Sequence, residues 1–232
     1  MENTAVLFVH GIQGQPAQFR FLIDALPAGV EVCAPLLPGH GKTAEEFHGS
    51  RCCDWFAAVR RETEQLRAEG KRIIYVGHSM GCLLGLLVSR KLGSPYDGML
   101  LLCCPFRPRV IGRIGDRIHK RKGEALRQLQ ASLEGNSVPV RNIRDCLLIL
   151  RPYGDLFRLM SAARQIPPRA GEKLRFFFAG DDEVVSVSSV CFARRWPSAE
   201  IRILEGCGHC YFPDEAKRIL QKTLNELIEA KQ

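Results

Sequence analysis

The sequence lacks the features that define several protein classes. No apolar run approaches the length of about 18 residues that a membrane-spanning helix needs, so we expect no transmembrane segment. No internal repeat or low-complexity tract is present, and an apolar content of 46% is too high for a disordered chain. The first four residues contain no basic segment and no cleavage site before an apolar strand begins. A length of 232 residues fits one domain, and we expect a cytoplasmic protein.

Metal-ligand spacing is also scarce. Most of the ten cysteines lie inside apolar segments, where a free thiol behaves as a small hydrophobic group. Cys207 and Cys210 have C-x-x-C spacing, but no second pair with zinc-ligand spacing accompanies them. We therefore predict no metal site, with metal or redox use of this pair as the alternative.

The most informative stretch is Gly-His-Ser-Met-Gly at residues 77–81. The apolar, β-branched residues 73–77 predict a buried strand, and residues 82–87 suit a buried helix. Gly-x-Ser-x-Gly between a strand and a helix is typical of a nucleophile elbow, in which a strained serine presents its hydroxyl at the top of the sheet. Gly77 and Gly81 would let strand and helix approach each other closely. The alternative is a serine in an ordinary glycine-rich turn.

Strands and helices alternate along the chain. This alternation requires crossover connections and predicts an α/β fold, with a mostly parallel sheet of about six strands flanked by helices. The expected strands are 5–9, 30–34, 73–77, 98–103, 174–179 and 199–204. The expected core helices begin near residue 16 and at 54, 82, 188 and 213.

Three polar sites follow predicted strands at the edge where ligands bind in an open parallel sheet. They are Ser79, the acidic segment 180–185 and the segment 205–209, which ends in His209. A serine needs an imidazole to accept its proton, and a carboxylate must hold that imidazole in the correct tautomer. The order serine, acid, histidine is the one required for an α/β-hydrolase triad.

Five motifs together resemble those of a small bacterial α/β-hydrolase of the carboxylesterase and monoacylglycerol-lipase type, over nearly the whole chain. They are His10-Gly11-x-x-Gly14, Pro38-Gly39-His40-Gly41, Gly77-x-Ser79-x-Gly81, Asp182-Glu183-Val184-Val185 and Gly206-x-Gly208-His209. The resemblance implies an α/β-hydrolase fold with Ser79 as nucleophile, Asp182 as acid and His209 as base. It implies no cofactor and no metal.

The position of the acid depends on register. Many relatives have a glycine three residues before the aspartate, and that register would select Glu183 here. The acid-x-hydrophobic-hydrophobic pattern that such carboxylesterases share selects Asp182 instead. We take Asp182, with Asp181 and Glu183 as the alternatives.

Acyl transfer also needs hydrogen-bond donors for the oxyanion. One is the backbone N–H of Met80, directly after the nucleophile. By the same resemblance, the second is the residue that follows His-Gly, which is Ile12. We expect Gly11 and His78 on the substrate-binding side, while His10 hydrogen-bonds within its own loop. An ordinary β–α turn is the alternative for this loop.

Residues 107–173 interrupt the alternation, and we expect them to form a basic helical lid inserted in a core of residues 1–106 and 174–232. The insertion holds fifteen Lys/Arg and six Asp/Glu, a charge of +9, whereas the whole chain carries +8. We expect lid helices at 124–133 and 155–166. The charge could attract anionic lipid surfaces or acidic substrates, with a solvated face as the alternative. The basic run at 119–122 has no aromatic stacking platform, so we expect no nucleic-acid partner.

The sequence therefore predicts a serine hydrolase that cleaves small-molecule carboxylic esters of modest acyl length. Hydrolysis of amides or thioesters by the same triad is one alternative, and a non-catalytic ligand-binding form of the fold is another. Nothing in the sequence specifies an oligomeric state.

Overall fold

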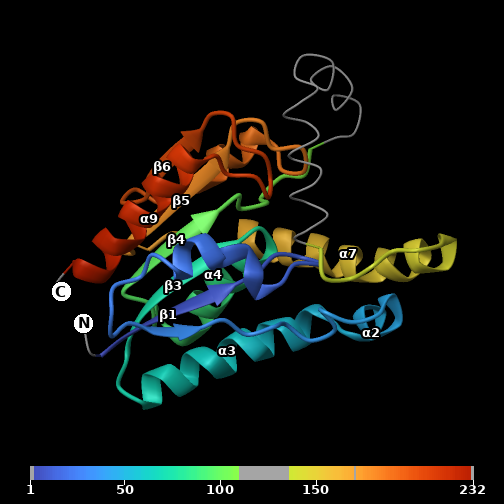
Figure 1. Cartoon of the computed structure of the whole chain (residues 1–232), viewed down its shortest axis with the longest axis horizontal. Helices are drawn as coiled ribbons and strands as arrows, with labels where there is room; N and C mark the ends of the chain where they lie inside the picture. Colours follow the sequence, from blue (N-terminus) through green and yellow to red (C-terminus); the bar gives the residue numbers. More distant parts are fainter. Residues whose placement is uncertain (1–2, 110–135, 170, 231–232) are drawn as a thin grey trace.

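A six-stranded parallel sheet forms the centre of the computed structural model, which describes residues 3–109, 136–169 and 171–230 (Figure 1). Its strands are β1 (Thr4–Val9), β2 (Glu31–Cys33), β3 (Arg72–His78), β4 (Gly98–Leu102), β5 (Leu174–Ala179) and β6 (Glu200–Leu204). They lie in the order β2-β1-β3-β4-β5-β6, and every neighbouring pair is parallel. The predicted α/β fold with a parallel sheet of about six strands is confirmed.

Helices cover both faces of the sheet, because strands such as β1 carry apolar side chains on both faces. Its side chains alternate, so that Ala5, Leu7 and Val9 face one hydrophobic cluster while Val6 and Phe8 face the other. The first cluster includes residues of α3 (Cys52–Ala68), α4 (Met80–Leu92) and α8 (Val190–Ala193). The second includes residues of α1 (Arg20–Ile23) and α9 (Asp214–Glu229). All five residues of β1 named here are at most 1% exposed, as expected for a strand buried on both faces.

Several core helices are shorter than predicted. The segment that begins at Pro16 is a 3₁₀ turn, η1 (Pro16–Phe19), followed by the single turn of α1. Residues 188–196 likewise divide into η3 (Val187–Ser189) and α8. The structure also contains α2 (Ala44–Gly49), for which no helix was predicted; Thr43 and Glu46 form a capping box at its start.

The helix of the insertion differs most from prediction. It is α7 (Ile143–Arg164), which begins twelve residues before the predicted start at 155. Pro152 lies inside it and has no N–H for the carbonyl of Leu148, a vacancy that normally ends a helix. His48 of α2 supplies the missing donor, because its Nδ1 donates to Leu148 O at 2.8 Å. The helix therefore continues through Pro152 with the help of a residue about a hundred positions away.

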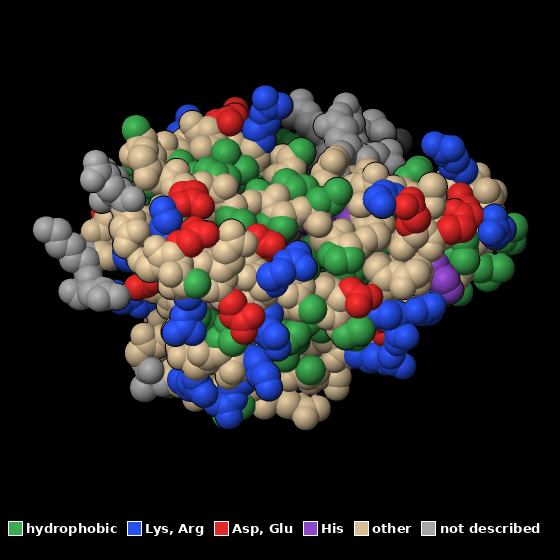
Figure 2. Space-filling model, turned by 90° about the horizontal axis from the view of Figure 1, so that it is seen from below, with side chains coloured by type: hydrophobic (Ala, Val, Ile, Leu, Met, Phe, Trp, Pro, Cys, Tyr) green, Lys and Arg blue, Asp and Glu red, His purple; other side chains and the backbone are tan. Residues whose placement is uncertain are grey.

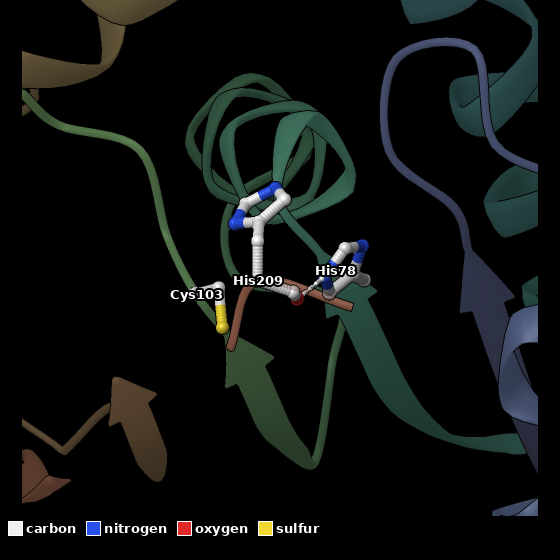
Figure 3. A group of neighbouring side chains, drawn as sticks. All are labelled: His78, Cys103 and His209. Atoms are coloured by element: carbon white, nitrogen blue, oxygen red, sulfur yellow. Dashed lines mark hydrogen bonds between the residues drawn. The ribbon is translucent and has the colours of Figure 1, made fainter. Parts of the chain in front are cut away.

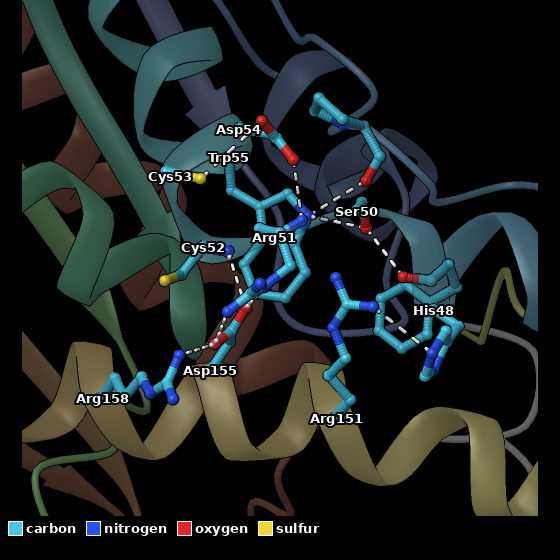
Figure 4. Close-up of polar contacts among 12 residues, drawn as sticks. His48, Ser50, Arg51, Cys52, Cys53, Asp54, Trp55, Arg151, Asp155 and Arg158 are labelled. Atoms are coloured by element: carbon cyan, nitrogen blue, oxygen red, sulfur yellow. Dashed lines mark hydrogen bonds and ion pairs between the residues drawn. The ribbon is translucent and has the colours of Figure 1, made fainter.

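A buried carboxylate ties α7 to the start of α3. Asp155 is 2% exposed and accepts hydrogen bonds from Arg51 Nε at 2.8 Å, the Cys52 N–H at 3.1 Å and Arg158 Nη1 at 3.0 Å (Figure 4). A charge removed from water in this way needs such partners. Arg51 and Asp155 thus fix α7 to the start of α3.

The apolar residues of α7 divide between two opposite faces. Leu156, Leu159 and Met160 are buried in the core. Leu147, Leu150 and Phe157 lie on the other face and are 62%, 62% and 52% exposed. The predicted helix 124–133 and the basic run 119–122 lie outside the described residues. Among the described residues, no helix has both the length and the hydropathy of a membrane span.

Candidate active site

Ser79 lies in the turn between β3 and α4, at φ 50° and ψ −119°. This conformation is in the left-handed half of the map, where a non-glycine residue is strained. Two backbone hydrogen bonds hold it there, from the Ser79 N–H to Leu102 O and from the Cys82 N–H to Ser79 O, both at 2.9 Å. The geometry is that of the predicted nucleophile elbow.

Close packing explains the two glycines of the elbow. A Cβ on Gly81 would stand 1.9 Å from Val9 O at the end of β1, so the backbone of β1 or α4 would have to shift. A Cβ on Gly77 would stand 2.8 Å from the Cys82 nitrogen. A side chain at either position would therefore push α4 away from the sheet.

The loop after β6 brings His209 to the elbow, and the loop after β5 brings Asp182. His209 Nε2 lies 3.0 Å from Ser79 Oγ, and its Nδ1 lies 2.9 Å from Asp182 Oδ2. A carboxylate accepts hydrogen bonds, so Nδ1 carries the proton and Nε2 is free to accept one from the Ser79 hydroxyl. All three side chains are at most 7% exposed.

The backbone beside Asp182 prepares its carboxylate for this contact. Its Oδ1 accepts from the N–H groups of Val184 at 2.8 Å and Val185 at 2.6 Å, which leaves Oδ2 for His209. Burial alone would raise the pKa of Asp182, but the His209 cation, its hydrogen bond and the two N–H groups lower it. Burial alone would lower the pKa of His209, but Asp182 and, more weakly, Glu183 raise it. The imidazolium is thus the species this environment stabilises.

Two residues next to the triad hold the backbone of His209. Glu183 Oε2 accepts from the His209 N–H at 2.9 Å, and His78 Nε2 donates to the His209 carbonyl at 2.8 Å (Figure 3). The side chain of Glu183, an alternative for the acid, therefore contacts the main chain of His209 and not its imidazole. Asp181, the other alternative, donates its N–H to Cys207 O. The predicted contact of His78 with substrate stays a prediction.

The loop after β1 lies directly beside Ser79. A Cβ on Gly11 would stand 3.0 Å from Ser79 Cβ, so a side chain at residue 11 would require this loop or Ser79 to shift by a few tenths of an ångström. Ile12, the predicted oxyanion donor, packs against the core. Met80, the other predicted donor, is the first residue of α4, where an N–H has no acceptor within the helix.

His10 holds the same loop through both of its ring nitrogens. Its Nε2 accepts from the Leu37 N–H at 3.0 Å, so its Nδ1 carries the proton and donates to Gly11 O at 2.8 Å. Burial, and after it the nearby His40, lower the pKa of His10 to about 3. His10 is therefore neutral at physiological pH and bonded within its loop, as predicted.

One group of described residues has metal-ligand geometry. The donor atoms of His78, Cys103 and His209 lie within 4.8 Å of one another (Figure 3). Both ring nitrogens of His209 already bond, to Asp182 and Ser79, so a metal ion there would displace part of the triad. These residues fit a hydrolytic site better than a metal site, and the absence of a metal stays a prediction.

A family model described as "Alpha/beta hydrolase family" matches residues 6–222, nearly the whole chain. The chain belongs to the alpha/beta hydrolase family. A thermostable monoacylglycerol lipase of Bacillus sp. (strain H-257) is 38% identical over 85 residues, which are 36% of this chain and 34% of that protein. A carboxylesterase of Bacillus subtilis (strain 168) is 36% identical over 106 residues, which are 44% of this chain and 42% of that protein. The matched part of this chain thus spans less than half the length of each of these relatives.

Solved structures share its fold over almost the full length. A chain described with the metagenome-derived lipolytic enzymes LipS and LipT aligns with a TM-score of 0.72 and 20% identity, covering 99% of this chain and 95% of the other. A monoacylglycerol lipase of Paleococcus ferrophilus aligns with a TM-score of 0.66 and 15% identity, covering 98% and 95%. At such identities the likeness establishes the fold.

Sequence reasoning missed several residues that contact the site. Glu183 was considered only as a rival acid, although it bonds to the His209 backbone. Gln13 and Tyr153 were not considered, although Tyr153 Oη donates to Gln13 Oε1 at 2.7 Å beside the predicted oxyanion loop. No local motif indicates such contacts, because each joins segments far apart in the sequence.

Proposed function

We propose that this chain is a serine hydrolase that cleaves carboxylic esters of modest acyl length through an acyl-enzyme on Ser79. His209 accepts the serine proton as Oγ attacks the carbonyl carbon, and the N–H groups of Ile12 and Met80 stabilise the oxyanion. His209 then protonates the leaving alcohol. A water molecule, activated by the same imidazole, releases the acid and regenerates Ser79 without a cofactor.

The observation that carries this proposal is the continuous hydrogen-bonded series from Ser79 Oγ to His209 Nε2 at 3.0 Å and from His209 Nδ1 to Asp182 at 2.9 Å. Strain in the serine backbone supports it, because such strain concentrates at functional residues. The names of the monoacylglycerol lipase and the carboxylesterase among the relatives support esters as the substrate class. A non-catalytic role would leave the pairing of a strained serine with a carboxylate-held histidine without purpose.

The test combines active-site labelling with ester hydrolysis. Wild type should react with a fluorophosphonate probe and should hydrolyse p-nitrophenyl esters of short and medium chain length. Ser79→Ala should lose both, while the control Ser89→Ala, a buried serine on the same helix, should keep both. No labelling of wild type would reject a serine hydrolase, and labelling that survives Ser79→Ala would reject this nucleophile. Faster turnover of thioesters or anilides would favour the alternative acyl substrates.

We further propose that residues 107–173, which connect β4 to β5, form the lid of this enzyme and contact anionic lipid surfaces. The outward face of α7 supports this. Its apolar side chains at i, i+4, i+7 and i+14 share one stripe and are 80%, 62%, 62% and 52% exposed: Ile143, Leu147, Leu150 and Phe157. The adjacent stripe carries Arg144, Arg151 and Arg158 at seven-residue intervals. Apolar and basic side chains also lie together in Figure 2, at the end of the molecule that holds α2 and α7.

An apolar stripe beside arginines matches a bilayer with anionic headgroups, in which the apolar side chains enter the interface and the guanidinium groups meet phosphate. Sedimentation with phosphatidylcholine vesicles, with and without phosphatidylglycerol, tests this. Binding should require the anionic lipid and should fall in Leu150→Ser. Ile203→Ser, which removes an exposed apolar residue on β6, should bind like wild type. Equal loss of vesicle binding in both variants, or binding independent of phosphatidylglycerol, would contradict this proposal.

The cytoplasmic location also stays a prediction, which fractionation of the native cells would test.

A further inference from the structure

Gln13 connects the loop beside Ser79 to the insertion through both its side chain and its backbone. Its Oε1 accepts from Tyr153 Oη at 2.7 Å, and its Nε2 donates to Val138 O at 3.4 Å. Because the Val138 carbonyl can only accept, the side-chain atom that faces it must be the nitrogen, and the oxygen of the Gln13 amide therefore faces Tyr153. Its own carbonyl accepts from the Ser137 N–H at 2.6 Å. A glutamine that is 8% exposed is thus fully engaged by residues 137–153.

Ser137 strengthens this connection. Its hydroxyl lies 3.0 Å from Gln13 O and 2.6 Å from Gly14 O, and donates to one of them at a time. The same oxygen accepts from the Gly41 N–H at 3.1 Å. Two loops that flank the site, one after β1 and one after β2, therefore meet at one serine of the insertion.

The backbone of Gln13 explains why such support is needed. The Gly14 N–H donates to Gly11 O at 3.0 Å, which closes a four-residue turn with Ile12 and Gln13 at its centre. Gln13 has φ 54°, whereas Ile12 does not have a positive φ, which is the pattern of a type II turn. Glycine or asparagine normally occupies that third position, and another residue there is strained by about 1–3 kcal/mol. Such strain persists only when surrounding contacts hold it.

We propose that Gln13 is a positioning residue for the oxyanion hole, and that Tyr153 and Ser137 act through it to hold the Ile12 N–H where the oxyanion forms. The inference rests on the proposed function, in which Ile12 is an oxyanion donor. Without these contacts the turn can relax to a form with negative φ at Gln13, which rotates its central peptide. That peptide carries the Ile12 carbonyl, so its rotation changes ψ at Ile12, and the adjoining Gly11–Ile12 peptide, whose N–H is the proposed donor beside Ser79, must shift with it. The insertion would then affect the chemical step as well as access to the site.

The test compares Tyr153→Phe and Gln13→Ala with wild type. Tyr153→Phe removes one hydrogen bond, and Gln13→Ala removes both side-chain contacts while alanine keeps the strain of a positive φ. We expect kcat for a p-nitrophenyl ester to fall about 10-fold in Tyr153→Phe and about 100-fold in the Gln13 variant, with KM nearly unchanged. The larger loss is comparable with the loss of one oxyanion donor. Tyr96→Phe, which removes a buried hydroxyl bonded to Thr63, is the matched control and should keep wild-type kcat.

A tetrahedral mimic separates positioning from general stability. An alkyl boronic acid that adds to Ser79 carries its negative oxygen into the oxyanion hole, so its Ki should rise by the same factor as kcat/KM falls. Unchanged kcat and Ki in both variants, or a change confined to KM or to the melting temperature, would overturn the proposal. If wild type itself fails to bind the boronic acid and the fluorophosphonate, the proposed function has failed instead.

Discussion

The choice between Asp182 and Glu183 as the acid can be tested with two nearly isosteric substitutions. In Asp182→Asn, the side-chain oxygen must stay at the position of Oδ1, because two N–H groups donate there, from Val184 at 2.8 Å and Val185 at 2.6 Å. The amide NH₂ then faces His209 Nδ1 at the 2.9 Å contact. That nitrogen can only accept from it, so the imidazole proton moves to Nε2. An Nε2 that carries a proton cannot take one from Ser79.

Asp182→Asn should therefore lower kcat about 10⁴-fold, which is the effect that the same change of tautomer has in serine proteases. This corresponds to about 5 kcal/mol in activation free energy. Glu183→Gln should behave differently, because an amide oxygen can still accept from the His209 N–H. We expect its kcat/KM at neutral pH to stay within about threefold of wild type, since a neutral acceptor weakens one hydrogen bond without removing it.

The pH profile adds an independent readout. Glu183 contributes to the raised pKa of His209, so Glu183→Gln should move the acidic limb of kcat/KM to lower pH. The assay is initial-rate hydrolysis of a p-nitrophenyl ester between pH 5 and 9, with melting temperatures to confirm folding. Activity of Asp182→Asn within tenfold of wild type, together with loss of several orders of magnitude in Glu183→Gln, would refute the reasoning from both side chains.

Three further predictions concern stability, each measured by urea unfolding. His48→Ala should lower the unfolding free energy by about 1–2 kcal/mol, because it leaves Leu148 O unpaired. The loss should be smaller in a Pro152→Ala background, where residue 152 regains an N–H. An equal loss of unfolding free energy in the two backgrounds would refute the role of His48 as the donor to Leu148 O. Gly81→Ala should cost at least about 3 kcal/mol, whereas Gly154→Ala on α7 meets no atom within 4 Å and should be neutral or stabilising. Three buried histidines have a low pKa and stay neutral in the folded protein between pH 6.5 and about 4, whereas in the unfolded chain they become protonated. The unfolding free energy should therefore fall as pH falls, by about 1.4 kcal/mol per pH unit for each histidine. They are His10, His40 and His78, with pKa values of about 3, 4 and 3, and His40→Gln should reduce the slope.

The parts of the fold that the sequence predicted correctly are those with local causes. Strand β5 has the predicted bounds, Leu174–Ala179, because a short segment that is apolar except for Arg175 and lies between polar turns is typical of a buried strand. The elbow was equally predictable, since the close approach of α4 and β1 leaves room only for glycine at residue 81. These features depend on neighbours in the sequence or on the order of strands in the sheet.

The errors occurred where a distant residue supplies what the local sequence lacks. Pro152 indicated a helix boundary, and only His48 on another helix removes the penalty for continuing. Gln13 gave no signal in the sequence, because its unusual backbone is stabilised by Ser137, Val138 and Tyr153, more than a hundred residues later. A hydrogen-bond partner at such separation cannot be read from periodicity or spacing.

The insertion contacts the site at two opposite sides, and this arrangement has a consequence for specificity. At its start, the Arg109 N–H donates to Val184 O and the Ser186 N–H donates to Arg107 O, beside the N–H groups that hold Asp182. Near its middle, Ser137 and Tyr153 hold Gln13 beside the predicted oxyanion donor. A substrate that displaces the insertion would therefore disturb both the acid loop and the turn that carries Ile12. Acyl chains that fit poorly should be discriminated in kcat as well as in KM, because binding and the alignment of the reacting groups depend on the same contacts.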